Sequence, residues 1–465
     1  MSPLSSLSGL FSTGDVFYGV LVASAILLIG AIWARRASEY RTIMLALQVK
    51  LLASLGYNMV LVFTYAAGDA LTYHRVGIDY ANVIRADLAD GTYNYLLSEP
   101  FFWITGYSTS RFNNLCGLVH FMAFDSFIGS TFIFAAMSFL GQLLLYRTFV
   151  VRYPDPRLRL WWKLGILFFP GLTFWSAGML KESVGLWALG CAVWGAHRYQ
   201  QRSSLKHFLL MAVGLYGLFL FRYQVLPAAL AGIIPWLLEA PQSPDAARSP
   251  QARGRKVSPD MMSRRVVCAV LIVISLVGMK YAGESQKNYA LDQLPETVAN
   301  QSSMYQAAPV VSFDGSWQGM LLAAPIATAS TLFRPFFWEA PTLLMQMAAL
   351  ENLLLLVLSL RAFSHVWANP ELFKRAVRAP MFVTCLVFVL LFAVLVGAST
   401  PNLGTLSRYR IPLLPFLVGV LVILEYQWME FRAAVSQERN QWMHTGRRRA
   451  ASLSLAGPGQ PHAEV

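Results

Sequence analysis

Apolar stretches of about 17 to 25 residues, the length that crosses a bilayer as a helix, recur along almost the whole chain. The sequence has 465 residues, of which 56% are hydrophobic and only 13% are charged. That composition leaves too little polar surface for soluble domains of this total length. The pattern therefore predicts an all-α, polytopic integral membrane protein that lies in the lipid bilayer.

Eleven transmembrane helices are expected, although three of them are shorter than an ideal crossing. They lie at residues 16–34, 45–66, 118–146, 162–180, 183–197, 207–221, 224–240, 266–282, 342–360, 380–397 and 411–428. The first is expected to be retained, because the N-terminus lacks the basic segment and cleavage pattern of a signal peptide. Residues 317–337 are also apolar but contain Pro325, Arg334 and Pro335, which favours a re-entrant or interfacial helix.

Lys and Arg are distributed unevenly between the short segments that join these spans. Segments on one side carry 27 of the 37 Lys and Arg residues, with Lys50 counted among them. Because basic loops stay in the cytoplasm, this asymmetry predicts an N-terminus outside and a C-terminus inside the cytoplasmic (inner) membrane. The same distribution accounts for the pI of 9.7 without nucleic acid, and no basic stripe carries base-stacking aromatics.

The expected organisation is a single transmembrane domain over residues 1–430 and a basic cytoplasmic tail over 431–465 that is disordered beyond Arg449. Residues 67–117 and 283–341 would form two large external loops. Both loops contain aromatic and amphipathic stretches that can lie along the membrane surface and cover a cavity. Residues 241–265 are rich in Pro, Ser, Arg and Gly, which is typical of a flexible loop.

A few ionisable residues remain on the side that is poor in Lys and Arg, and they lie at the ends of spans. These residues are Asp69, Lys181, Glu182, Arg222, Arg334, Glu339, Arg408 and Arg410. Charges at such positions break the topological pattern, and an anionic partner explains them better than topology does. They are the candidate functional site.

Asp69 follows Gly68 where the second span emerges, in the sequence GDALTYH. A carboxylate at the mouth of a low-dielectric cavity can take a proton from a hydroxyl, so Asp69 is the candidate catalytic base. The alternative is an N-cap of the following helix, with Tyr73 and His74 as interfacial side chains. Both interpretations stay open from the sequence.

The cations are candidate phosphate ligands, since Arg and Lys are the side chains that bind phosphate oxygens. The candidates are Lys181, Arg222, Arg334, Arg408 and Arg410. Lys181 and Glu182 can instead pair with each other, and each arginine can extend to lipid headgroups. Trp338 can stack on a sugar ring or anchor the chain at the interface. Glu339 accompanies Arg334 in the same segment.

Other kinds of site have little support in the sequence. Asp125 and Glu351 fall inside predicted spans and are candidates for function or for hydrogen bonds between helices, the latter favoured by Asn352. The seven histidines and four cysteines lack metal-ligand or disulfide spacing. No nucleotide-binding motif or nucleophile elbow is present. No cofactor is therefore expected, and a divalent metal ion is left open.

An external carboxylate in the first large loop, with cations at several span ends, resembles the GT-C superfamily of polytopic membrane glycosyltransferases. The segments that carry the resemblance are GDALTYH, FWSAGMLKES, LFRPFFWEA and NLGTLSRYRIPLLP. In that family a first-loop aspartate serves as base, and basic residues hold the phosphate of a polyprenyl-linked sugar. The resemblance implies transfer of a sugar from a polyprenyl phosphate or diphosphate carrier to a glycan or lipid acceptor on the outer face, with Asp69 as base.

Two alternatives stay open. The chain also resembles Wzy-like polysaccharide polymerases and ligases, which would transfer a whole repeat unit and depend more on the arginines than on Asp69. The second alternative is a transporter or flippase of an anionic, lipid-linked substrate, which would place its site near the midplane of the membrane.

Overall fold

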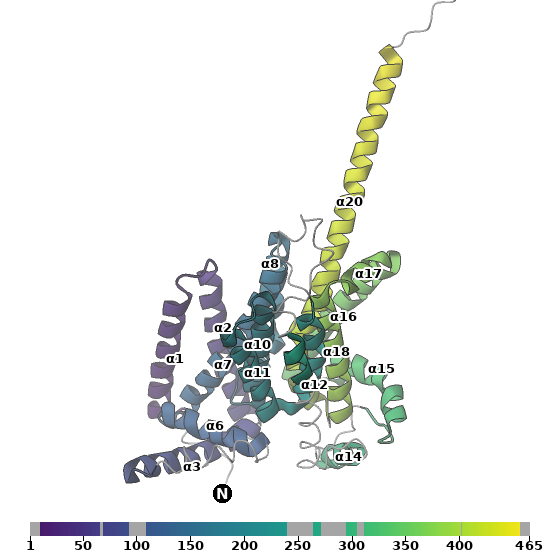
Figure 1. Cartoon of the computed structure of the whole chain (residues 1–465). Helices are drawn as coiled ribbons and strands as arrows, with labels where there is room; N and C mark the ends of the chain where they lie inside the picture. The colour runs from purple at the N-terminus through teal and green to yellow at the C-terminus, as the bar shows by residue number, and fades with distance from the viewer. Residues whose placement is uncertain are drawn as a thin grey trace, which may run out of the picture.

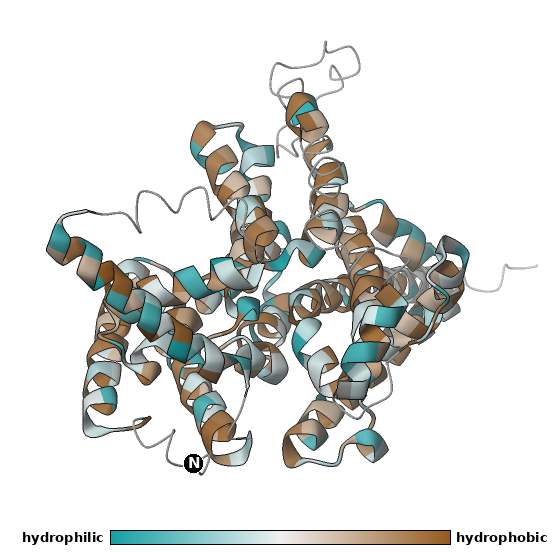
Figure 2. Ribbon diagram, turned by 90° about the horizontal axis from the view of Figure 1, so that it is seen from below, coloured by the Kyte–Doolittle hydropathy of each residue, from teal (hydrophilic) through white to brown (hydrophobic). Residues whose placement is uncertain are grey.

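The computed structural model describes residues 10–65, 68–92, 108–239, 264–270, 294–304, 311–400 and 402–455. Over these residues the chain is helical, with no β-strand. Most helices stand upright in one bundle, whereas α3 (Asp69–Asp90), α6 (Ser108–Met122) and α14 (Leu294–Met304) lie across one end of it (Figure 1). Seen from below, hydrophobic residues dominate the bundle, with hydrophilic residues in smaller groups between them (Figure 2).

Seven helical segments are long and apolar enough to cross a membrane, which supports a helical membrane protein; eleven spans are not established. They are α1 (Thr13–Ala34), α2 with its π-helical end (Tyr40–Tyr65), α7 (Phe127–Arg152), α11 with α12 (Leu205–Leu237), α16 (Leu343–Ala368), α18 (Pro380–Ser399) and Ile411–Gln437. Several predicted spans do not match this set, because local features of the chain divide, shorten or bury the corresponding helices.

The predicted span at 118–146 is divided between two helices. Phe124 and Asp125 have positive φ angles of 54° and 60°, so the chain leaves α6 there and begins α7 in a new direction. Ser126 then caps α7 by accepting a hydrogen bond from the backbone N–H of Gly129. Asp125 therefore lies at a helix boundary and not inside a span.

The predicted span at 162–180 is broken into pieces that are each too short to cross. They are α8 (Arg159–Trp162), the π-helical turn at Lys163–Leu167 and α9 (Pro170–Trp175). Pro170 begins α9, because proline has no N–H to continue the preceding turn and is favoured at the first position of a helix. The predicted span at 183–197 lies in α10 (Lys181–Gln201), which is almost entirely buried in the protein.

The apolar segment 205–237 contains two helices that run in opposite directions. Arg222, at the end of α11 (Leu205–Arg222), pairs with Glu182 at the start of α10. Glu239, just after α12 (Leu226–Leu237), accepts a hydrogen bond from Gln200 at the end of α10. The chain therefore turns at residues 223–225 and returns along α10, as the separate predictions for 207–221 and 224–240 required.

Other predictions fall partly outside the described residues. This holds for most of the span at 266–282, for the loop at 241–265, and for parts of both external loops. The apolar segment 317–337 forms α15 (Trp317–Phe333), which is followed by Arg334. This helix packs on α18, and Thr331 of α15 donates a hydrogen bond to the carbonyl of Ala393 of α18. α20 (Leu414–Leu455) continues as one helix past Arg449, where the sequence predicted disorder, and extends far out of the bundle (Figure 1).

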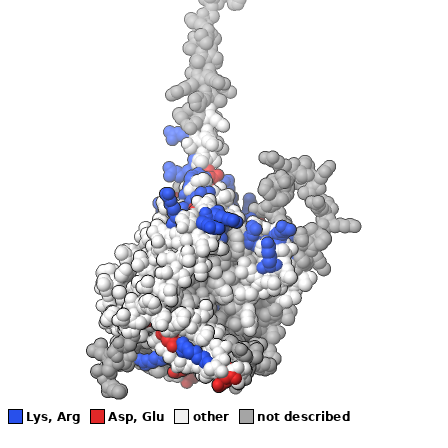
Figure 3. Space-filling view, turned by 90° about the vertical axis from the view of Figure 1, so that its left-hand side faces the viewer, with Lys and Arg blue, Asp and Glu red and all other residues white. Residues whose placement is uncertain are grey.

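Ion pairs join the predicted basic segments at one end of the bundle. Four such pairs connect loops and helix ends that are far apart in the sequence: Glu39 with Lys163 (3.0 Å), Arg152 with Glu239 (3.1 Å), Arg157 with Glu430 (2.5 Å) and Arg361 with Glu425 (2.6 Å). Figure 3 shows Lys and Arg around the end from which α20 leaves, and a smaller mixed group of charges at the opposite end. On the face shown, the described surface between the two ends carries no charged side chains (Figure 3).

Lys50 does not belong to that basic end. Lys50 lies inside the predicted span 45–66. Because α2 begins at Tyr40, Lys50 falls in the middle of the helix and is only 1% exposed. Its Nζ donates to the carbonyl of Thr173 (3.1 Å) and to Ser176 Oγ (2.7 Å), at the broken end of α9. Counting Lys50 with the cytoplasmic loop was wrong.

Glycines allow the central helices to approach closely. A Cβ on Gly190 of α10 would meet the backbone of Gly141 on α7, and a Cβ on Gly214 of α11 would meet the backbone of Ala192 on α10. Small residues at such crossings let membrane helices pack backbone to backbone. α10 is therefore held firmly between α7 and α11, and it presents its first turn at the end where α3 and α6 lie.

Candidate functional site

Four of the predicted site residues meet in one ionic cluster at the end of the bundle opposite the basic loops. Arg408, in α19 (Leu403–Tyr409), lies 2.8 Å from Asp69 (Nη2 to Oδ2) and 2.9 Å from Glu182 (Nε to Oε1). Arg222 pairs with the same Glu182 oxygen. We call Asp69, Glu182, Arg222, Arg408 and the neighbouring Lys181 the ionic cluster.

Each member of the ionic cluster lies at the end of a helix. Asp69 begins α3, Lys181 and Glu182 begin α10, and Arg222 ends α11. Gly68 has a φ of 143°, a conformation that side-chain-bearing residues rarely adopt, and it allows the sharp turn from α2 into α3. Helix ends from distant parts of the sequence are thereby brought to one place.

The two carboxylates of the ionic cluster have different environments. The Glu182 side chain is only 2% exposed, whereas that of Asp69 is 51% exposed. Glu182 is therefore fixed between two guanidinium groups inside the protein, and Asp69 is open to a ligand. The guanidiniums of Arg222 and Arg408 lie 4.8 and 5.4 Å from the ring centre of Tyr409, which adds a cation–π contact to both.

Arg408 keeps its positive charge in this setting. Burial lowers the pKa of its guanidinium, but the carboxylates of Glu182 and Asp69, together with Tyr409, outweigh that effect and hold the pKa well above its usual value. Asp69 and Arg408 therefore form a persistent pair.

Lys181 has hydroxyl groups as its described hydrogen-bond partners. Its Nζ donates to Ser108 Oγ (3.2 Å) and Thr109 Oγ1 (2.7 Å) at the start of α6. Lys181 and Glu182 thus do not pair in the way the simpler sequence interpretation suggested. The ionic cluster holds three cations and two carboxylates, so it carries a net positive charge and can accept an anion.

Arg410 points away from the ionic cluster into the core, where it is 2% exposed. It donates to Asn352 Oδ1 and to the carbonyls of Thr331, Leu332 and Arg334 at the end of α15, and it lies 3.7 Å from Glu351. The positive charge complements the unsatisfied carbonyls of a helix C-terminus. Its partners are internal, and the structure does not bring its guanidinium to the ionic cluster.

Arg334 and Glu339 pair with each other in a bidentate contact, with Arg334 Nε 3.0 Å from Glu339 Oε1. The hydrogen bond from Arg334 lowers the pKa of Glu339. The nearby Trp338 is 81% exposed and stacks on Phe336 with 4.9 Å between ring centres. This segment therefore presents an exposed aromatic surface beside a paired arginine, not a free cation.

Tyr73 and His74 lie on different faces of α3. Burial raises the pKa of Tyr73, and the charges of the ionic cluster act on it as well. His74 instead forms a 2.8 Å hydrogen bond with His120 of α6 and lies beside Phe127. Only Tyr73 is oriented toward Asp69 and its partners.

Three residues near the site were missed or underestimated in the sequence. Tyr409 lies between two arginines in RYR, and Lys50 is a buried cation that was counted with the basic loop although it lies inside the predicted span 45–66. Glu351 was recognised, and it proves to connect α16 to the N-terminus of α9 by accepting from the Gly171 N–H (2.5 Å). An isolated charge within an apolar run was the available signal for Lys50.

No group of three or more His, Cys, Asp or Glu side chains that could hold a metal ion occurs among the residues that the structure describes. No protein-family model, no curated protein and no solved structure matches this chain. What the chain does must therefore be argued from its own residues.

Proposed function

We propose that the protein is a membrane glycosyltransferase that moves a sugar from a polyprenyl phosphate or diphosphate carrier to a glycan or lipid acceptor, at the external face of the inner membrane. The observation that carries the proposal is the ionic cluster. An exposed carboxylate, Asp69, lies directly beside an excess of cations, at the end of the bundle opposite the basic loops. A lipid-linked sugar phosphate needs both an anion site and a base close to the bilayer surface.

The proposed reaction uses the ionic cluster in two roles. The acceptor hydroxyl attacks the anomeric carbon while Asp69 takes its proton. The bond from that carbon to the phosphate oxygen breaks, and the electron pair leaves with the phosphate. Arg408, Arg222 and Lys181 stabilise the charge that develops on this leaving group, where preorganised cations in a water-poor site are most effective.

The pairing of Asp69 with Arg408 gives this scheme an order of events. Within the pair, the Asp69 carboxylate is engaged by the Arg408 guanidinium, with 2.8 Å between Oδ2 and Nη2. A donor phosphate that binds Arg408 would compete with this contact and free the Asp69 carboxylate to face the acceptor hydroxyl. Donor binding therefore precedes proton transfer in the proposed sequence.

The other predicted site residues have supporting roles in this proposal. Arg410 fixes the end of α15 and thereby the segment that bears Arg334, Glu339 and Trp338. The exposed Trp338 ring can anchor this segment at the headgroups or contact the sugar. No nucleic acid and no nucleotide take part.

The test is the substitution Asp69→Asn, with Asp79→Asn as a matched control at an exposed position on the same helix. We expect Asp69→Asn to reduce transfer from a polyprenyl-linked sugar in membranes by about 100-fold or more, since loss of a general base has effects of that order. The protein level in the membrane should not change. Turnover by Asp69→Asn at the rate of Asp79→Asn would rule out the proposed base.

A repeat-unit polymerase is the second candidate, favoured by the convergence of Arg222 and Arg408 on a buried carboxylate. Such an enzyme would retain activity in Asp69→Asn and lose it in Arg408→Gln. The length of the transferred glycan, measured by mass spectrometry of the product, separates the two activities. A transporter is less compatible with a charged cluster at one end of the bundle, because alternating access requires a site near the midplane.

A further inference from the structure

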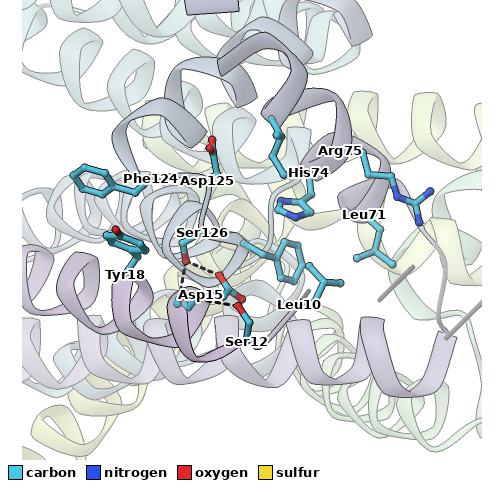
Figure 4. A pocket seen from close by; sticks show the side chains of 13 residues that line it. Leu10, Ser12, Asp15, Tyr18, Leu71, His74, Arg75, Phe124, Asp125 and Ser126 are labelled. Carbon is cyan, nitrogen blue, oxygen red and sulfur yellow. Dashed lines mark hydrogen bonds between the residues drawn. The ribbon is translucent and has the colours of Figure 1, made fainter. Parts of the chain in front are cut away.

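A cavity of about 440 Å³ lies beside α3, at the same end of the bundle as the ionic cluster. It is bounded by the first turns of α1 and α7 and by one face of α3 (Figure 4). Its volume is within the range of about 300 to 1,000 Å³ that is usual for sites of small molecules. The ionic cluster is not part of its lining.

Helix α3 separates this cavity from the ionic cluster. Leu71, His74 and Arg75 line the cavity, whereas Asp69 begins the helix and pairs with Arg408. Asp69 and His74 are five residues apart, which corresponds to about 7.5 Å along a helix axis. A ligand in the cavity would therefore lie beside the first two turns of α3, the helix that Asp69 begins.

The floor of the cavity is a fixed polar network around Asp15. The carboxylate of Asp15 accepts hydrogen bonds from Ser126 Oγ (2.7 Å), the Ile128 N–H (3.2 Å) and the Phe11 N–H (3.0 Å). These bonds fix the first turn of α1 to that of α7. Asp15 therefore has a structural role in the cavity, because its carboxylate accepts hydrogen bonds from within the protein.

His74 presents a lone pair to the cavity. The carbonyl of Cys116 can only accept, so His120 must donate to it from Nδ1 (2.8 Å). Neutral His120 therefore accepts at Nε2, and His74 must be the donor there, from its Nδ1 (2.8 Å). The remaining nitrogen of His74, Nε2, is then an acceptor, and among the described residues it has no protein hydrogen-bond partner.

Burial, together with His120 and Arg75, lowers the pKa of His74 to about 3. The imidazole is therefore neutral at physiological pH and keeps its lone pair. Hydroxyl groups are natural donors to such an acceptor. The carboxylates of Asp15 and Asp125 are balanced by Arg75 in the lining and by Arg85, which pairs with Asp125, so the cavity has no excess of positive charge for an anionic phosphate. The cavity favours an uncharged ligand that is rich in hydroxyl groups.

An aromatic pair forms one side of the cavity. The rings of Tyr18 and Phe124 stack with 5.0 Å between their centres and an angle of 21°. Phe124 is 57% exposed and lies in the turn between α6 and α7, with a φ of 54°. The neighbouring Asp125 forms an ion pair with Arg85, with 2.8 Å between Oδ2 and Nη2. Flat apolar faces beside a few fixed polar groups are typical of sites that orient small molecules.

We propose that this cavity binds one uncharged sugar unit of the acceptor, with a sugar hydroxyl donating to His74 Nε2 and the sugar ring beside Tyr18 and Phe124. The assignment rests on the proposed glycosyltransferase function and adds a separate acceptor site to it. The donor phosphate would occupy the ionic cluster on the other side of α3. The two substrates would then meet at Asp69.

The test measures binding and does not depend on turnover. Saturation-transfer NMR on the purified full-length protein in lipid nanodiscs would use the methyl glycosides of glucose, galactose, mannose and N-acetylglucosamine as probes. Gly14→Leu fills the cavity, because Gly14 lines it and a Cβ there meets no atom within 4 Å. His74→Leu removes the acceptor, and His74→Gln restores an acceptor oxygen.

We expect at least one glycoside to bind the wild-type protein, and its affinity to fall at least about tenfold in Gly14→Leu and in His74→Leu, as expected for a lost site or an unpaired hydroxyl. His74→Gln should stay within about threefold of the wild type. Should His74→Leu fail to fold, Gly14→Leu decides alone. Absence of binding of all four glycosides to the wild type, or unchanged binding in Gly14→Leu, would overturn the assignment.

Failure of this inference is distinguishable from failure of the proposed function. Transfer that requires Asp69, without glycoside binding, would remove the acceptor site and leave the glycosyltransferase. Glycoside binding that is sensitive to Gly14→Leu, with full activity in Asp69→Asn, would leave the sugar site and remove the proposed base.

Discussion

Glu182 shows how much the ionic cluster depends on one buried residue. It is the shared partner of Arg222 and Arg408, and its side chain is 2% exposed. In the sequence it appears as one half of a Lys-Glu pair at a turn. Its role depends on two arginines that lie 40 and 226 positions further along the chain.

The substitution Glu182→Gln should therefore destabilise the protein strongly. It leaves two buried guanidinium groups without their shared counter-charge, and breaking a buried pair in this way removes about 3 to 5 kcal/mol of folding free energy. The measurement is the thermal unfolding midpoint of purified protein. Glu371→Gln, which breaks the exposed pair with Lys374, is the control and should leave the midpoint unchanged. Equal midpoints for both variants would contradict the central role of Glu182.

His74 gives the protein a defined sensitivity to acid. Burial lowers its pKa to about 3, from an ordinary value of about 6.5. Between these values the unfolded state binds a proton that the folded state does not, so stability is present above pH 6.5 and decreases as the pH falls. The decrease is at most about 1.4 kcal/mol per pH unit for this residue.

The variant His74→Gln should lose part of this sensitivity. The drop in unfolding midpoint between pH 7.5 and pH 5 should be smaller in the variant than in the wild type. The neighbouring groups His120, Arg75, Asp15 and Asp125 are present in both proteins. An identical drop in both proteins would show that His74 titrates normally.

At the scale of helices, the bundle depends on close crossings between α7, α10 and α11. The hydropathy of the sequence identifies helices that face lipid well, because their composition must match the bilayer along their whole length. It identifies buried helices less well. α10 is shielded by its neighbours and is less apolar, so its role became clear only from packing.

Gly190→Ala tests the importance of this packing. A Cβ at Gly190 would overlap the backbone of Gly141, and overpacking of this kind usually destabilises by about 1 to 3 kcal/mol. Gly56→Ala in α2 is the matched control, because a Cβ there has no neighbour within 4 Å. Unfolding midpoints of the two variants would be compared. A lower midpoint for Gly56→Ala than for Gly190→Ala would contradict the close approach of α7 and α10.

For the whole molecule, the contacts divide the charged segments between two ends. The segments that were predicted to be cytoplasmic are joined to one another by ion pairs, and Asp69 and Arg408 meet at the opposite end. The assignment of these ends to the cytoplasm and the exterior is part of our proposal and can be tested directly.

Single added cysteines would report the orientation. All four natural cysteines are buried, so they leave little background for a membrane-impermeant maleimide. We expect Thr92→Cys, just after α3, to be labelled in intact cells, and Lys206→Cys, in the first turn of α11, to be labelled only after lysis. The reverse pattern would place the ionic cluster in the cytoplasm and rule out transfer at the external face.

The sequence by itself determined the class of protein, the helical fold and the set of span-end charges, because hydropathy and charge must suit a bilayer whatever the tertiary packing. It placed Asp69, Glu182, Arg222 and Arg408 among the candidates. Only the tertiary structure decided which candidates meet. Arg408 and Arg410 are two residues apart, yet one joins the ionic cluster and the other supports the end of α15. The physical reason is that side-chain direction follows from the turn of the helix and the neighbours it packs against, which linear spacing does not record.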